Sequence, residues 1–143
     1  MRIFEHGLIP PILALVFWSL VVCLWLYATR IPAMMQARIR AQEGALAGAI
    51  NARMPPGARQ VADNYNHLME QPTIFYAAAI AAQSAGATDI VNVGLAWGYV
   101  ALRIAHSLVQ CTFNAVILRF VIFALSAAAL ATLAVRTAIA LWT

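Results

Sequence analysis

Charged side chains are scarce in this chain, and lysine is absent from it. Only 10% of its 143 residues are charged, whereas 64% are hydrophobic and the mean hydropathy is +0.81. A soluble domain carries about 25% charged residues and less than half apolar ones. A water-soluble fold would have no place for this much apolar surface. We therefore expect residues 1–143 to form a single membrane domain.

Two further absences exclude classes of protein. The first apolar run, Leu8–Ala28, contains no acidic residue, which argues against a small multidrug exporter, because such four-helix proteins depend on a glutamate in their first helix. Cys23 and Cys111 lie in apolar runs and form no Cys-x-x-Cys pair, so no disulfide framework is predicted. His67 and Glu70 spell His-x-x-Glu, but two ligands on one helix are weak evidence for a metal, and no metal site is predicted.

The apolar runs predict an all-α fold, a polytopic four-helix bundle in a membrane. The helices are expected at about 8–29, 58–85, 90–111 and 115–142, with a polar loop at about 30–57. The first run has about 21 residues, which suffices to cross a hydrocarbon core of roughly 30 Å. Met-Pro-Pro-Gly at 54–57 is a strong helix break, and Asp89 is suited to cap the third helix.

The arginines predict how the bundle is oriented. Five of the nine lie in or next to the polar loop: Arg30, Arg38, Arg40, Arg53 and Arg59. The turn at 86–89 contains none. By the positive-inside rule the loop lies in the cytoplasm and both termini lie outside. The alanine- and arginine-rich composition without lysine is typical of a bacterial chain, so we expect the inner membrane.

Several polar residues lie inside the predicted spans. Arg103, His106 and Gln110 belong to the third span and Arg119 to the fourth. A charged group in a bilayer costs at least a few kcal/mol, so such groups face protein, water or a ligand. At 1.5 Å per residue, His106 and Arg119 lie about 9 Å and about 7 Å from the turn between these two helices. Glu70 lies where the second helix enters the membrane from the same side.

Polar faces of several helices therefore meet at one level. The third helix presents four residues at spacings of four, three and four, which share one face: Tyr99, Arg103, His106 and Gln110. The second helix presents Asp63, Asn66, His67 and Glu70, and Arg38 follows the first helix on this side. Arginines at fixed positions suit an anionic ligand, and an arginine beside a bound thiol favours the thiolate. We predict a polar, arginine-lined cavity that opens to the cytoplasm.

Each of these residues also has a purely structural interpretation. Arg103 and Glu70 could form an interhelical ion pair, and His106 could hydrogen-bond across helices. The guanidinium groups of Arg119 and Arg136 could extend from the ends of the fourth helix to the lipid headgroups. The sequence leaves these alternatives open.

Two blocks of the sequence resemble the MAPEG family (membrane-associated proteins in eicosanoid and glutathione metabolism). The first runs from Asn64 to Tyr76 and includes Glu70 before an apolar and aromatic stretch. The second is Tyr99-Val-Ala-Leu-Arg-Ile-Ala-His-Ser at 99–107, followed by Arg119. The resemblance covers most of residues 60–125, and four helices in a chain of this length agree with it.

The resemblance implies a homotrimer with sites at the subunit interfaces. Many family members bind glutathione near the cytoplasmic side and conjugate, isomerise or reduce lipophilic electrophiles. It implies that Arg119 is the catalytic residue, which stabilises the glutathione thiolate. The residues implied to bind glutathione as co-substrate are Arg38, Asn66, His67, Glu70, Tyr99, Arg103, His106 and Gln110.

The sequence also departs from the family pattern. His67 occupies the place of an expected asparagine, Asp63 and Asn66 occupy the places of arginines, and Gln110 that of a tyrosine. These departures keep a second function open, a non-catalytic lipid-binding or scaffold trimer. In either case the expected partners are membrane lipids and a small lipophilic molecule, and no nucleic acid.

Overall fold

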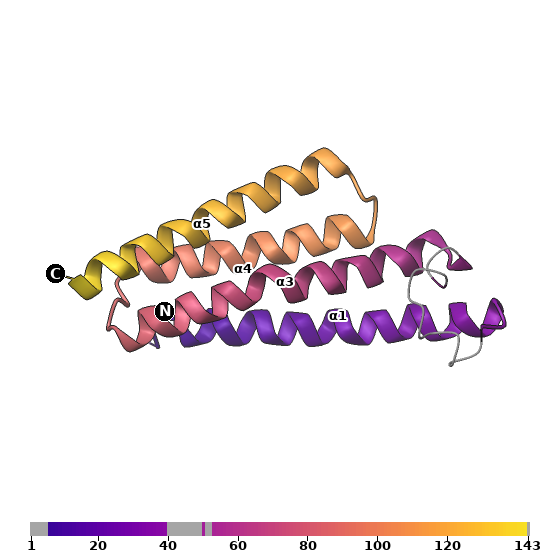
Figure 1. Cartoon of the computed structure of the whole chain (residues 1–143), viewed down its shortest axis with the longest axis horizontal. Helices are drawn as coiled ribbons and strands as arrows, with labels where there is room; N and C mark the ends of the chain where they lie inside the picture. Colours follow the sequence, from indigo (N-terminus) through magenta and orange to yellow (C-terminus); the bar gives the residue numbers. More distant parts are fainter. Residues whose placement is uncertain (1–5, 40–49, 51–52, 143) are drawn as a thin grey trace.

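The computed structural model describes residues 6–39, 50 and 53–142, and four long helices account for most of them (Figure 1). They are α1 (Ile9–Gln36), α3 (Pro56–Ser84), α4 (Ile90–Cys111) and α5 (Val116–Trp142). The described residues contain no β-strand. The predicted all-α four-helix fold is therefore confirmed, while Arg40 and most of the segment at 40–52 lie outside the described residues.

Successive helices run in opposite directions, so the N-terminal end of α1 and the C-terminal end of α5 lie at the same end of the bundle (Figure 1). α1 packs mainly on α3, and α4 mainly on α5. Toward the turn that joins α4 to α5, α5 leans away from the rest of the bundle (Figure 1). The α5 residues near this turn line the two cavities of the candidate functional site.

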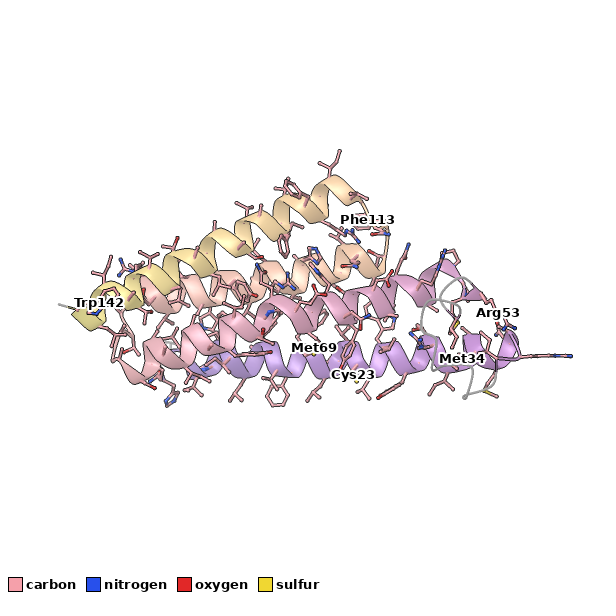
Figure 2. All side chains as sticks on the ribbon, in the orientation of Figure 1. Cys23, Met34, Arg53, Met69, Phe113 and Trp142 are labelled. Carbon is pink, nitrogen blue, oxygen red and sulfur yellow. The ribbon has the colours of Figure 1, made fainter. Side chains whose placement is uncertain are left out.

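The outer surface of the bundle is apolar. α1 and α5 are each long and apolar enough to cross a membrane, with a mean hydropathy of 2.3, and they are the two such helices among the described residues. Phe17, Leu24, Ile117 and Trp142 each leave more than half of their surface exposed, and Figure 2 shows Trp142 at the C-terminal end of α5. Soluble monomers rarely expose apolar patches of this extent, so lipid is the solvent that suits this surface.

α1 continues to Gln36, beyond the end predicted near residue 29. Pro32 lies inside the helix and removes one backbone N–H donor, yet the helix continues for one more turn. Hydrogen bonds between backbone groups then close its C-terminal end. Arg38 adopts a positive φ of 53°, and the Ile39 N–H donates to the Met34 carbonyl at 3.0 Å. This 6→1 bond is that of a Schellman motif, which satisfies carbonyls at a helix end.

α3 ends with the same motif around Gly86, whose φ is 71°. The Ala87 N–H donates to the Ala82 carbonyl at 2.9 Å. An L side chain in this conformation costs about 1–2 kcal/mol, so we expect Gly86→Ala to lower the free energy of unfolding by about 1 kcal/mol. Thermal unfolding in detergent measures this effect.

Gly94, inside α4 with open space around it, provides the matched control. Gly94→Ala should leave stability unchanged or raise it, because alanine has the higher helix propensity. Equal effects of the two substitutions would contradict this explanation of the α3 end.

The core lies where all four helices meet. Phe75 of α3 and Tyr99 of α4 stack with ring centroids 4.4 Å apart, and neither has any exposed surface. Leu15 of α1 and Leu133 of α5 belong to the same buried cluster. This packing fixes α3 and α4 side by side and thereby sets the positions of the polar residues farther along both helices.

A polar cluster joins α4 and α5 at the opposite end from the cavities. Asp89 caps α4, as predicted, by accepting from the Val91 N–H at 3.0 Å. Arg136 of α5 donates to Asp89 at 3.1 Å and to Asn92 at 2.7 Å, so its guanidinium is bound within the protein. Desolvation alone would raise the pKa of the Asp89 carboxyl, but backbone N–H groups and the Arg136 guanidinium outweigh it and lower that pKa.

Candidate functional site

A polar cavity of about 290 Å³ lies between α3, α4 and α5. Its lining residues come from all three helices: Asp63, Asn66, His67, Glu70, His106, Gln110 and Arg119. All seven side chains either can carry a charge or contain a carboxamide that both donates and accepts, and Arg119 supplies the permanent positive charge. The cavity is therefore suited to a polar ligand with both donor and acceptor groups.

A second, more apolar cavity of about 240 Å³ adjoins the first. Val116, Phe120 and Phe123 of α5 form its apolar part, and it shares three residues with the polar cavity: His67, His106 and Arg119. The side chains of Val116 and Phe120 are also largely exposed on the outer surface. An apolar molecule from the lipid could therefore come into contact with the same three residues that line the polar cavity.

Arg119 occupies the boundary between the two cavities. Its Nη1 donates to Asn114 Oδ1 at 2.7 Å, whereas its Nε is buried without a hydrogen-bond partner among the described residues. A buried guanidinium N–H without a partner is costly, which indicates that a ligand or water completes its bonding.

Two histidine rings form the common wall of the cavities. The centroids of His67 and His106 are 5.0 Å apart, and the His67 ring also lies 5.2 Å from that of Phe123. His67 Nδ1 is 3.5 Å from a carboxylate oxygen of Glu70, whose side chain is largely exposed. The Glu70 carboxylate thus remains accessible from the cavity.

Arg103 does not line either cavity, but it binds the backbone of His67, which does. It is only 1% exposed, and it donates to the His67 carbonyl at 3.0 Å and to Gln71 Oε1 at 3.3 Å. Its guanidinium carbon lies 5.6 Å from the Phe123 ring centroid. The ion pair between Arg103 and Glu70 considered from the sequence does not form; the Glu70 carboxylate lies against the His67 imidazole instead.

The structure brings most of the predicted site residues together. Asn66, His67, Glu70, His106, Gln110 and Arg119 line the polar cavity. Tyr99 does not, because it lies deeper along α4, where its ring stacks on Phe75 in the core. Arg38 does not either, because α1 extends further than predicted and leaves Arg38 exposed in the turn that ends it.

Gln110 adds a second unfilled hydrogen-bonding position. It is 6% exposed and lines the polar cavity, and its Oε1 has no partner among the described residues. An unpartnered acceptor and an unpartnered donor, on Gln110 and Arg119 respectively, thus border one cavity. Native proteins seldom leave such atoms unsatisfied, so both favour a site that is completed by a bound molecule.

The site residues that were not predicted from the sequence are Val116, Phe120 and Phe123 of the apolar cavity and Asn114, the partner of Arg119. Asn114, in the turn between α4 and α5, binds Arg119 through its side chain. Phe123 contacts both histidine rings and is four residues from Arg119, so it lies one helical turn away on the same face. Helical spacing from Arg119 would have identified Phe123, but no local pattern indicates the role of Asn114.

A model of the MAPEG family matches residues 8–139, nearly the whole chain. No curated protein and no solved structure matches the chain. The family match extends over all four helices and includes every residue that lines the two cavities.

Proposed function

The chain belongs to the MAPEG family and is an integral membrane protein, and we propose that it is a glutathione-dependent transferase or peroxidase for lipophilic electrophiles. The observation that supports this proposal most directly is the position of Arg119. It borders a polar cavity and an apolar one at the same time. A polar thiol and an apolar electrophile would meet beside its guanidinium, and such proximity accounts for much of the rate of two-substrate reactions.

The residues of the polar cavity fit glutathione. Its ammonium group would find acceptors in the carboxylates of Glu70 and Asp63 and in the unpartnered Oε1 of Gln110. An anionic group would find its partner in Arg119. The proposed binding set also includes Asn66, His67 and His106, while Arg103 would act by holding the backbone of His67 in place.

Glutathione supplies the thiol that attacks or reduces the electrophile. Arg119 would favour the thiolate by placing positive charge next to the sulfur. Val116, Phe120 and Phe123 would hold the apolar part of the second substrate and keep water from it. Transfer to an electrophilic carbon forms a carbon–sulfur bond, and the electron pair of the broken bond leaves with the departing group.

We also propose the assembly that the family suggests and the location that the composition and the arginine distribution suggest. The chain would form a homotrimer in a bacterial inner membrane, with the segment around 30–57 in the cytoplasm and both termini outside. The five arginines in or next to that segment favour this orientation. The exposed apolar faces of α1 and α5 are available for contact with lipid or with another subunit.

Glutathione binding to the detergent-solubilised protein tests the proposal directly. At ten times its Kd, a ligand that binds only the folded state stabilises it by about 1.4 kcal/mol. We expect wild-type protein to show such a thermal shift at millimolar glutathione. Arg119→Ala and Glu70→Gln should each weaken binding about tenfold or more, since each removes a charge that faces the ligand.

Arg59→Ala is the matched control, because Arg59 is an exposed arginine on the same helix as Glu70 but outside both cavities. It should bind glutathione like the wild type. If folded wild-type protein gives no thermal shift and no calorimetric signal, the glutathione proposal is wrong.

A lipid-binding or scaffold function is the second candidate. The exposure of Val116 and Phe120 favours it, because an acyl chain from the bilayer could reach the apolar cavity directly. Mass spectrometry of purified protein should then detect one retained lipid that Phe120→Ala releases. Thiol-dependent turnover of an electrophile would exclude a purely non-catalytic function.

A further inference from the structure

Two locally unfavourable features lie next to each other at the start of α5. Asn114 has a φ of 51°, a left-handed conformation that costs energy for residues with a side chain, although asparagine adopts it more readily than most. Arg119 lies in the first turns of α5, where its positive charge faces the positive end of the helix dipole. Neither feature helps the helix to form. Conformations of this kind persist where the surrounding structure enforces them, often at functional sites.

A hydrogen bond joins these two residues. Asn114 Oδ1 accepts from Arg119 Nη1 at 2.7 Å. The backbone of Asn114 is itself anchored to α4, because its N–H donates to the Val109 carbonyl at 2.8 Å. The side-chain oxygen of Asn114 thus occupies a fixed point relative to α4, and Arg119 is held against that point.

The Asn114 side chain does not serve as an ordinary helix cap. In the part of the chain that the structure describes, its oxygen accepts no backbone N–H from the first turn of α5; its partner is the Arg119 side chain. A cap would stabilise the helix by satisfying a free N–H group. The bond to Arg119 instead restricts a flexible, charged side chain at the edge of a cavity.

We propose that Asn114 is a positioning residue that orients the Arg119 guanidinium toward the site where the thiol binds. The part concerning the thiol rests on the function proposed above. With Nη1 tied to Asn114, the guanidinium is held at the boundary between the two cavities, and its Nε has no hydrogen-bond partner among the described residues. Groups that stabilise developing charge act best when they are held in place before the ligand arrives.

Asn114→Gly separates the two roles of this residue. Glycine adopts the positive φ without strain and keeps the backbone bond to Val109, but it removes the side chain that binds Arg119. We expect nearly unchanged thermal stability, because the relieved backbone strain offsets the lost hydrogen bond, together with a roughly fivefold lower kcat at neutral pH. The pH profile of turnover should shift to higher pH, with KM for the electrophile little changed.

Asn92→Ala is the matched control at the other end of the same helix pair. Asn92 also accepts from an arginine of α5, with Arg136 Nε at 2.7 Å, and it is 1% exposed. Its removal should lower thermal stability and leave the pH profile unchanged. Asn114→Gly is therefore expected to change activity and its pH profile, whereas Asn92→Ala is expected to change stability.

Phenylglyoxal, which modifies arginine side chains, gives a measurement that does not require glutathione. Peptide mapping should show Arg119 reacting several-fold faster in Asn114→Gly than in the wild type, and unchanged in Asn92→Ala. Equal reactivity of Arg119 in all three proteins would overturn the positioning role even if glutathione binds. Faster modification of Arg119 without any glutathione binding would support the contact between Asn114 and Arg119 and reject the proposed thiol function. A lower kcat without a shift of the pH profile would reject the orientation of Arg119 toward the thiol.

Discussion

Arg119→Ala should lower the glutathione-dependent turnover of a lipophilic electrophile about 100-fold at neutral pH. Removing one preorganised group that stabilises charge in an active site costs about 10²–10³ in kcat. Here the loss has a specific cause, because fewer bound thiols are ionised without the neighbouring guanidinium. The fold should survive, since the side-chain hydrogen bond that Arg119 makes within the described residues is the one to Asn114.

The pH dependence of turnover distinguishes a charge effect from a packing effect. In Arg119→Ala the rate should rise steeply above neutral pH, as hydroxide ionises the thiol in the absence of the arginine. Arg119→Lys keeps the charge but loses the planar donor group, so it should retain intermediate activity and a less shifted profile. An Arg119→Ala protein with a parallel, uniformly reduced profile would indicate a steric role for Arg119.

Arg136→Ala serves as the control on the same helix. Arg136 binds Asp89 and Asn92 far from both cavities. Its removal should reduce stability at that end of the bundle without altering the pH profile. If Arg119→Ala and Arg136→Ala gave the same loss of turnover, the effect would have to be assigned to disturbed packing of α5.

The sequence predicted helix ends best where one side chain determines them. Asp89 precedes an apolar run and caps α4 with its own carboxylate, which accepts from the Val91 N–H at 3.0 Å. The end of α1 could not be predicted in this way. There the helix continues past Pro32 and is closed by Arg38 in a conformation that glycine usually adopts. Nothing in a lone arginine signals a positive φ, so the turn had to be seen in the structure.

Helical spacing predicted which face of α4 is polar but not what each residue on it contacts. Gln110 and Tyr99 lie on that face, yet Gln110 borders the polar cavity while Tyr99 stacks in the core. The depth of a residue along the helix determines its neighbours, and depth depends on how α3 and α5 pack. Arg103 illustrates the same limit, since its charge binds the His67 carbonyl and Gln71 in place of the expected Glu70.

Phe75→Ala should destabilise the fold more than Gly86→Ala does. Phe75 is fully buried and stacks on Tyr99, with ring centroids 4.4 Å apart. In soluble proteins, such a substitution costs about 3–5 kcal/mol from lost transfer energy and the cavity that remains. In lipid the transfer part is smaller, because the bilayer is as apolar as the core. We therefore expect about 2–3 kcal/mol, mostly from lost packing.

Phe17→Ala tests this argument about lipid as the reference solvent. Phe17 on α1 is 64% exposed and faces outward, so its loss leaves no cavity and removes few contacts. Unfolding of both variants by a denaturing detergent, titrated into mild micelles, compares their free energies of unfolding. If Phe17→Ala lowered the free energy of unfolding as much as Phe75→Ala does, Phe17 would have to pack against another subunit. Replacing phenylalanine by alanine on a surface that contacts only lipid should change this free energy much less. A small effect for Phe75→Ala would instead show that α3 and α4 can repack, and the cavity built on their relative position would then be adaptable in shape.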